Sequence, residues 1–387
     1  MGAGFSRWKS SRCPRVRSPG QPQPVSTALW RTPARARRIT SRPRGTHYPG
    51  VMMPVGFNFS KLDFLKNVPR RYVWFGALTL TLVVLGAISW SRFSAGPFAR
   101  PIPGSKWTQA TQEPDLRVFV KETGAVRTMK FEDYIAGVVA AEMDPSWPLE
   151  ALKSQAIVAR TFTIEQLERK GGVAAAHPGA DVSTDPQEFQ AFDAGRVNDN
   201  VRRAVQETRG VIITYRGRPV RAWFHSDAGG QTATPVEGLG GQAEAGDFPY
   251  LRTVRVPWTS PNTEWSATFT RDEVRRAAME AGQDPGSVAS VSVGRKGPSG
   301  RAVDIVVGNA TVPAPDFRLA IGSDRMRSTL ITSLTMQGDK VVMTGRGNGH
   351  GVGLAQWAAK AMAEQGRTAD DIVRFFYSRA RLSKLWP

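Results

Sequence analysis

An uncharged apolar segment from Tyr72 to Trp90 divides the 387-residue chain into a basic head and a long remainder. It covers 19 residues, the length that a helix needs to cross a hydrocarbon core of roughly 30 Å. Basic residues come just before it, at Lys61, Lys66, Arg70 and Arg71. Such residues stay on the cytoplasmic side, so the sequence predicts one N-terminal transmembrane helix with the rest of the chain outside. A cleaved signal peptide is the alternative, but no A-x-A pattern follows, which favours an uncleaved anchor.

The basic excess of the chain lies mostly ahead of this segment. Residues 1–71 hold 15 Lys and Arg against one acid, Asp63, whereas the remainder holds 37 basic and 32 acidic residues. A nucleic-acid interface would place the excess on the folded body, so nucleic-acid binding is not expected. Residues 1–71 are predicted to be a largely disordered cytoplasmic tail, because the first 50 are rich in Arg, Pro and Ser without periodicity. Met52 and Met53 offer alternative starts, in which case residues 1–50 are not translated.

The exported part of the chain has no cysteine, because Cys13 lies in the tail. Neither a disulfide nor a thiolate metal site can form there, so its stability must come from packing. Residues 91–115 are interrupted by Pro and Gly and are predicted to be a spacer. The folded unit is expected over residues 116–387, which is long enough to bury a proper core.

Helical and strand-like patterns alternate in no regular order along this unit, which favours an α+β fold. The expected strands are Leu116 to Lys121, Val211 to Tyr215, Val220 to His225, Trp265 to Thr270, Val288 to Val293, Ala302 to Val307 and Val341 to Thr344. The expected helices are Phe131 to Met143, Pro148 to Lys170, Arg271 to Ala281, Val352 to Gln365 and Thr368 to Phe376. The spacing leaves open whether there is one domain or two lobes; the region from Gly238 to Pro261 is the divider in the second case.

One carboxylate lies on the apolar face of the first predicted helix. The apolar residues of this face recur at helical spacing, at Phe131, Tyr134, Ile135, Val138 and Val139. Glu142 follows at i+11, within about 20° of Phe131 at roughly 100° per residue. Its carboxylate is therefore expected to point toward the interior.

Two cations lie in the apolar stripe of the next predicted helix. Lys153 and Arg160 are seven residues apart and share a face with Leu149 and Leu152. Buried unpaired charges are costly, so one inward carboxylate and two inward cations suggest a shared polar cleft. A structural salt bridge explains the same pattern, and long basic side chains can also reach out of a stripe.

A glycine-rich segment, from Gly345 to Gly353, precedes the fourth predicted helix. It lacks Gly-Lys-Ser/Thr, and His350 stands where G-x-G-x-x-G needs its third glycine, so nucleotide binding is not expected. With glycine on both sides, His350 is predicted to face a ligand rather than to pack.

The remaining histidines suggest neither a triad nor a metal site. His225 and Asp227 face one side of a strand and Ser226 the other, which excludes a proton relay among them. No H-E-x-x-H or comparable spacing is present, so the spacing gives no support for a metal site, and no cofactor is predicted.

Several segments together resemble the stage II sporulation protein D family, over about residues 107–387. They are Tyr134-Ile-Ala-Gly-Val-Val-Ala-Ala-Glu142-Met, Trp147-Pro-Leu-Glu-Ala-Leu-Lys153-Ser-Gln155-Ala-Ile-Val-Ala-Arg160-Thr, Phe224-His-Ser226-Asp-Ala-Gly-Gly-Gln-Thr, Phe248-Pro-Tyr-Leu, Ser299-Gly-Arg, Arg327-Ser-Thr and Gly345-Arg-Gly-Asn-Gly-His350-Gly-Val-Gly-Leu-Ala-Gln356-Trp. The resemblance implies an α+β domain of mixed helices and short strands around one catalytic cleft. It also implies a peptidoglycan lytic transglycosylase acting on stripped glycan strands.

The resemblance places the essential glutamate on Glu142 and supporting basic residues on Lys153 and Arg160, which would hold the lactyl carboxylate or stabilise developing charge. Substrate-binding positions are expected in the same motifs, at Gln155, Ser226, His350 and Gln356. Some relatives bind zinc through a histidine and two cysteines, but here Ser183 and Phe189 stand in place of cysteines after His177, so no zinc is predicted.

The partners implied are peptidoglycan strands and, in a wall-remodelling complex, a cell-wall amidase. The alternative function is a non-catalytic amidase enhancer that binds wall glycan or the amidase. A plain wall-binding structural protein is a third.

Overall fold

The computed structural model describes residues 106–240 and 248–387. The predicted tail, transmembrane helix and most of the spacer lie outside these residues. Within the two described ranges, no helix is both long enough and apolar enough to span a membrane. The described chain mixes helices with short strands, so the predicted α+β class is confirmed.

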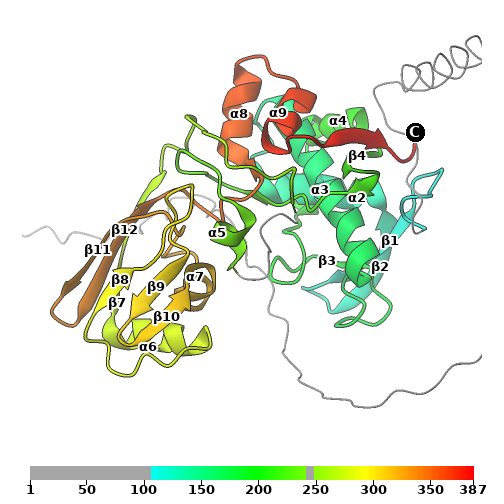
Figure 1. Cartoon of the computed structure of the whole chain (residues 1–387). Coiled ribbons are helices and arrows are strands. Elements are labelled where there is room, and N and C mark those ends of the chain that lie inside the picture. The colour runs from blue at the N-terminus through cyan, green and yellow to red at the C-terminus, as the bar shows by residue number, and fades with distance from the viewer. Residues whose placement is uncertain (1–105, 241–247) are drawn as a thin grey trace, which may run out of the picture.

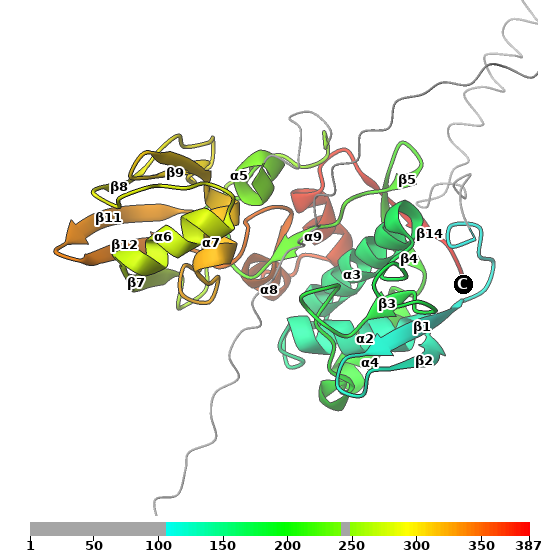
Figure 2. The same cartoon turned by 90° about the horizontal axis from the view of Figure 1, so that it is seen from below.

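Buried apolar side chains form two separate clusters, which define two lobes (Figures 1 and 2). The first lobe comprises residues 106–240, 248–258 and 348–387, and the second comprises residues 264–346. The second lobe is thus an insertion, because the chain leaves the first lobe near Trp258 and returns to it after Arg346.

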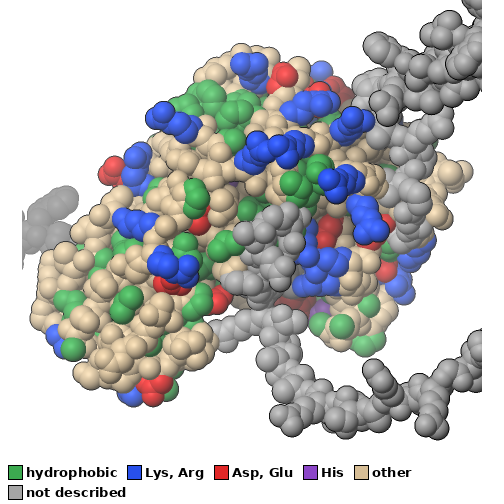
Figure 3. Space-filling view, viewed as in Figure 1, with side chains coloured by type: hydrophobic (Ala, Val, Ile, Leu, Met, Phe, Trp, Pro, Cys, Tyr) green, Lys and Arg blue, Asp and Glu red, His purple; other side chains and the backbone are tan. Residues whose placement is uncertain are grey.

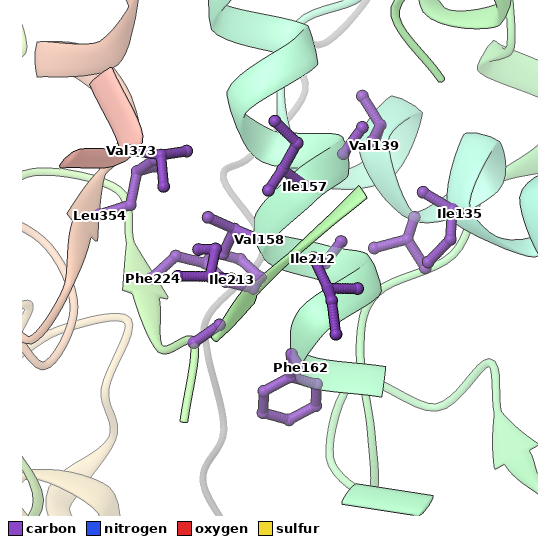
Figure 4. Close-up of a cluster of buried hydrophobic side chains, with 14 of the residues drawn as sticks. Ile135, Val139, Ile157, Val158, Phe162, Ile212, Ile213, Phe224, Leu354 and Val373 are labelled. Carbon is purple, nitrogen blue, oxygen red and sulfur yellow. The ribbon is translucent and has the colours of Figure 1, made fainter. Parts of the chain in front are cut away.

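The first lobe is built around α3 (Leu149–Lys170), which is buried on nearly every side between Ala151 and Leu167. Its hydrophobic neighbours come from α2 (Phe131–Glu142) and the strand β4 (Val211–Tyr215), as Figure 4 shows. The remaining helices of the lobe are η2 (Ala194–Arg196), α4 (Asp199–Glu207), α5 (Pro235–Leu239), α8 (Gln356–Glu364) and α9 (Ala369–Phe376). A helix so enclosed offers no solvent-facing side to its central residues.

Three small sheets complete the first lobe. Their orders are β2 (Ala125–Lys130)-β1 (Asp115–Val120)-β3 (Val182–Ser183), β14 (Arg381–Lys384)-β4-β5 (Arg218–Pro219), and β13 (Leu354–Ala355)-β6 (Phe224–His225). The β13-β6 pair is parallel, with Leu354 opposite Phe224. It therefore brings two motifs about 130 residues apart in sequence next to each other.

The second lobe consists of two antiparallel sheets and two helices. The sheets are β10 (Ala310–Pro313)-β9 (Asp304–Val307)-β8 (Val291–Val293) and β11 (Ile331–Gln337)-β12 (Lys340–Arg346)-β7 (Glu264–Thr270), and the helices are α6 (Arg271–Glu280) and α7 (Ala314–Ile321). α6 begins with a capping box between Thr270 and Glu273, which satisfies its first backbone donors.

A buried arginine fastens the second lobe to the first. Arg301 donates to the backbone carbonyls of Ala228 at 2.7 Å and Gln231 at 2.8 Å. Gly351 has φ +84°, and a Cβ there would lie 2.6 Å from the guanidinium carbon of Arg301. The glycine-rich segment is thus needed for close packing of the protein against itself.

Several predicted elements agree with the structure to within a residue or two, notably α2, α3, β4, β7 and α6. The helix expected from Val352 begins only at Gln356, because Leu354 and Ala355 pair with β6. The sequence analysis missed β2, β3, α4, α5, β10, α7, β11 and β14.

Candidate active site

Glu142 is the last residue of α2, and its side chain is partly exposed. The backbone N–H of Ala191 donates to its Oε1 at 3.2 Å. The segment that carries Ala191 lies across α2, because the N–H of Asp193 donates to the carbonyl of Gly137 at 3.0 Å. A Cβ on Gly137 would lie 2.2 Å from the Phe192 ring, so this position requires glycine for the segment to approach. The absence of a side chain at Gly137 therefore positions a donor at the carboxyl group.

Burial raises the pKa of Glu142 from 4.5 to about 7, although hydrogen bonds from Ala191 and Gln356 lower it. In the described part of the chain, no lysine or arginine forms an ion pair with this carboxyl group. The group is thus close to half protonated at neutral pH, which suits a residue that must both donate and accept a proton.

Gln155 and Gln356 lie together beside Glu142. Gln356, the first residue of α8, hydrogen-bonds to Glu142, and its Nε2 lies 3.5 Å from Oε1 of Gln155. The carbonyl of Ser226 accepts from the N–H of Trp357 at 3.1 Å. The structure therefore brings two predicted substrate-binding residues, Gln155 and Gln356, to the predicted catalytic glutamate, and it places the backbone of Ser226 next to Trp357.

Two tryptophans that the sequence analysis did not single out lie in the same region. Trp147, in the turn after α2, and Trp357, beside Gln356, have ring centroids 4.9 Å apart. Both are partly exposed, and Nζ of Lys360 lies 6.0 and 5.8 Å from their ring centroids. Their positions inside the two motifs around Glu142 and Gln356 could have indicated this aromatic pair.

Arg160 does not share a cleft with Glu142, so that prediction is wrong. Its guanidinium pairs with Glu132 at 2.6 Å and donates to the carbonyl of Val211 at 2.9 Å. Glu132 lies at the opposite end of α2, about 15 Å from Glu142 at 1.5 Å per residue. Glu132 also accepts from the indole N–H of Trp386 at 2.9 Å. For Arg160, the alternative interpretation of the sequence, a structural salt bridge, is therefore correct.

Lys153 is also held away from Glu142. It pairs with Glu150 at 2.7 Å and Glu207 at 3.2 Å, on α3 and α4. Lys153 and Gln155 are two residues apart, so they project about 200° apart around α3. Since Gln155 faces the Glu142 site, Lys153 faces away from it.

His350 packs in the interior, contrary to the prediction that it faces a ligand freely. Its side chain is 5% exposed, and Nδ1 accepts from the N–H of Val352 at 3.0 Å. Burial, followed by the nearby charge of Arg318, lowers its pKa to about 3. A neutral histidine therefore shapes the glycine-rich segment, and it lines a cavity other than the Glu142 site.

His177 is engaged with a carboxylate and an aromatic ring. Its Nε2 lies 2.8 Å from Glu188, and its ring stacks on Phe119 with centroids 3.6 Å apart. Over residues 106–240 and 248–387, the structure contains no group of three or more His, Cys, Asp or Glu placed to hold a metal ion.

Replacing Glu142 with glutamine is expected to stabilise the protein at alkaline pH. Because folding raises this pKa, the folded state binds the proton more tightly, and wild-type stability falls as pH rises from 4.5 to above 7. The variant lacks this loss and should be about 1–3 kcal/mol more stable at pH 8.5, with the difference vanishing below pH 4.5. Urea unfolding at both pH values measures this, and an equal stability difference at both would contradict the burial of the charge.

Comparison with known proteins agrees with the family resemblance of the sequence motifs. Residues 120–215, which include Glu142, Gln155 and Arg160, match the family model described as SpoIID, stage II sporulation protein. Stage II sporulation protein D of Bacillus subtilis (strain 168) is 29% identical over 299 residues, which are 73% of this chain and 83% of that protein. Its counterpart in Bacillus amyloliquefaciens is 29% identical over 304 residues, 74% of this chain and 83% of that protein.

A second kind of relative is the amidase enhancer of Bacillus subtilis (strain 168), 27% identical over 300 residues. The match covers 64% of this chain but only 40% of the enhancer. The segment that carries Glu142 thus matches the SpoIID family model, and the chain is similar to two stage II sporulation D proteins over most of their length.

Proposed function

We propose that the protein is a peptidoglycan lytic transglycosylase, anchored by residues 72–90, with its folded part outside the cytoplasmic membrane. The observation that carries this proposal is the environment of Glu142: a partly exposed carboxyl group with a pKa raised to about 7 and no ion-pair partner in the described residues. The adjacent tryptophans, Trp147 and Trp357, offer apolar faces against which sugar rings can pack.

The proposed reaction needs only one carboxyl group. Protonated Glu142 donates its proton to the glycosidic oxygen as the bond from C1 of N-acetylmuramic acid to that oxygen breaks. The carboxylate then takes the proton of the muramyl 6-hydroxyl as O6 bonds to C1. The product is a 1,6-anhydro end, and Glu142 regains its proton without water.

The carboxylate nearest to Glu142 in the sequence, that of Asp144, forms hydrogen bonds within the turn after α2. Asp144 accepts from the N–H of Ser146 at 2.9 Å and from its hydroxyl at 2.8 Å. These bonds lower the pKa of Asp144 and bind its carboxylate into the turn after α2. This supports a one-carboxyl mechanism over the carboxylate pair of the hydrolases.

The activity is expected to depend on pH through Glu142. Since the free enzyme must hold this group protonated, kcat/KM should fall as pH rises through about 7. Release of anhydro products from stripped glycan, measured by mass spectrometry between pH 5 and 9, tests this. A rate that is flat across this range would contradict a proton donor of this pKa.

A second function, stimulation of a wall amidase without catalysis, is supported by the similarity to the amidase enhancer. The two functions differ in their products. Full-length protein incubated with stripped glycan alone should release anhydro sugars if it is a transglycosylase. If stripped glycan gives no product, and an amidase releases stem peptides from intact peptidoglycan faster with the protein than without it, the protein is the enhancer.

A further inference from the structure

The chain after α2 forms a turn that leads from Glu142 to Trp147, and a second segment, residues 191–200, runs along this turn. At one end of the segment, the N–H of Ala191 donates to Glu142 at 3.2 Å. At the other end, Nδ2 of Asn200 donates to the carbonyls of Trp147 at 2.9 Å and Pro145 at 3.1 Å. The same segment therefore borders both the candidate catalytic carboxyl group and the aromatic pair.

Arg196 lies in the middle of this segment, as the last residue of η2. Its side chain is exposed, and its guanidinium forms no hydrogen bond or ion pair with the residues that the structure describes. Hydrogen bonds from Ser146, followed by the charges of Arg196 and Lys360, lower the pKa of Asp144, which agrees with a position of Arg196 beside the turn. Arg196 thus offers its donors to a ligand at this turn.

The other basic residues considered for the site already have carboxylate partners, at 2.5–2.7 Å: they are Lys360, Lys153 and Arg160. The carboxylate of Asp144 accepts from the N–H of Ser146 at 2.9 Å and forms no ion pair with Arg196 in the described ranges. Among the four cations, Arg196 is therefore the one left to bind an anion from outside.

Trp147 and Trp357 provide an apolar surface beside the same turn. Both side chains are partly exposed, and their ring planes are inclined at 60° with centroids 4.9 Å apart. Because the rings are tilted rather than parallel, the pair presents an angled apolar surface and does not bury its faces in each other. Such a surface suits a ligand with one apolar face and polar edges, as a sugar ring has. A sugar ring held there lies beside the turn that Arg196 borders.

An aromatic pair beside a free arginine suits a sugar that carries a carboxylate. In peptidoglycan this sugar is N-acetylmuramic acid, whose lactyl carboxyl group forms an uncharged amide as long as the stem peptide is attached. Removal of the peptide leaves a carboxylate. A guanidinium binds a carboxylate through two parallel charge-assisted hydrogen bonds, which the amide cannot accept in the same way. Arg196 can therefore distinguish stripped glycan from intact glycan.

We propose that Trp147 and Trp357 hold an N-acetylmuramyl ring and that Arg196 binds its free lactyl carboxylate, which makes the protein selective for stripped glycan. The choice of a glycan rests on the proposed function. Arg196 takes the carboxylate-binding role that the sequence motifs suggested for Lys153 and Arg160.

Calorimetric titration of the full-length Glu142→Gln variant in detergent tests the proposal, because this variant is expected to bind glycan without cleaving it. The ligand is a stripped tetrasaccharide of alternating N-acetylglucosamine and N-acetylmuramic acid, and its matched control has the lactyl carboxyl groups converted to methylamides. The methylamide should bind about fivefold more weakly, a loss of about 1 kcal/mol that suits an exposed ion pair. The difference should shrink at high salt. Equal affinity for the two ligands at low salt would overturn carboxylate recognition.

Two further substitutions, each made in the Glu142→Gln protein, assign the contacts. Arg196→Gln should bind the stripped tetrasaccharide about fivefold more weakly and the methylamide unchanged. A general loss of structure would weaken both, so an equal loss for both ligands, or no loss for either, would overturn the role of Arg196. Trp357→Ala should weaken both ligands about tenfold. Unchanged affinity in Trp357→Ala would overturn the aromatic part of the site.

The control variant accounts for general attraction to a polyanion, because basic side chains are numerous on the face of the first lobe seen in Figure 3. Arg202→Gln removes an exposed positive charge from α4, where Arg202 lines an open cavity together with Glu132, at the end of α2 opposite to Glu142. It should bind both ligands as the parent protein does. A loss equal to that of Arg196→Gln would reduce the effect to general attraction and overturn the site.

The titrations involve no bond cleavage, so the site and the proposed reaction can fail separately. If the wild type releases no anhydro products but Arg196→Gln abolishes the preference for the carboxylate, the transglycosylase is refuted and the glycan-binding site stands. If anhydro products are released but the methylamide binds as tightly as the stripped tetrasaccharide, only the role of Arg196 is refuted.

Discussion

The Glu142→Gln variant of the full-length protein is expected to lose roughly 10² to 10⁴ of the rate at which anhydro products are released from stripped glycan. The amide keeps the size of the side chain and can still accept from Ala191, which donates at 3.2 Å in the wild type. It cannot give a proton to the leaving oxygen or take one from the 6-hydroxyl. Mass spectrometry of soluble products, at equal protein concentration, measures the loss.

The matched control is Glu122→Gln, which makes the same change of charge at an exposed position of the first lobe. It should retain wild-type activity. Because Glu142→Gln is expected to be at least as stable as the wild type, unfolding cannot explain its inactivity. Wild-type rates in Glu142→Gln would refute the assignment of Glu142, whatever the activity of the control.

The second large effect is expected on stability. Arg160→Met leaves Glu132, which is 7% exposed, as a buried charge without its cation. Breaking a buried ion pair in this way costs about 3–5 kcal/mol, a large part of the 5–15 kcal/mol that typically stabilises a folded protein. The remaining donors to Glu132, the N–H of Gly210 at 3.0 Å and the indole of Trp386, do not neutralise it. Urea unfolding measures the difference.

Two further variants separate a structural role from a catalytic one. Arg160→Met combined with Glu132→Gln should recover part of the lost stability, because no uncompensated charge remains. Lys153→Met should cost only about 1 kcal/mol, since its side chain is 19% exposed and its pairs are near the surface. If Arg160→Met kept full stability but lost activity, Arg160 would instead act on the substrate.

The sequence by itself determined the local elements and singled out Glu142 as the candidate catalytic residue. Apolar periodicity fixed α2 and α3 to within a residue or two, because the core faces of these helices recur every three or four positions. The same periodicity put Glu142 on the face of α2 that packs inward, and the motifs around it showed the resemblance to the SpoIID family. Elements with little periodicity, such as α7 with its two prolines nearby, gave no such signal.

Only the tertiary structure decided which charges meet. Helical periodicity predicts the direction in which a side chain points from its own helix, but not which element packs against it. This matters for α3 because it is buried on almost every side. Arg160 and Lys153 therefore found partners on α2 and α4 that are far from Glu142. The parallel pairing of β13 with β6 brought Gln356 to Glu142 instead. Long-range contacts of this kind depend on how distant segments of the chain pack together, which no local sequence pattern encodes. The cavity that His350 lines, between the lobes, also depends on such packing.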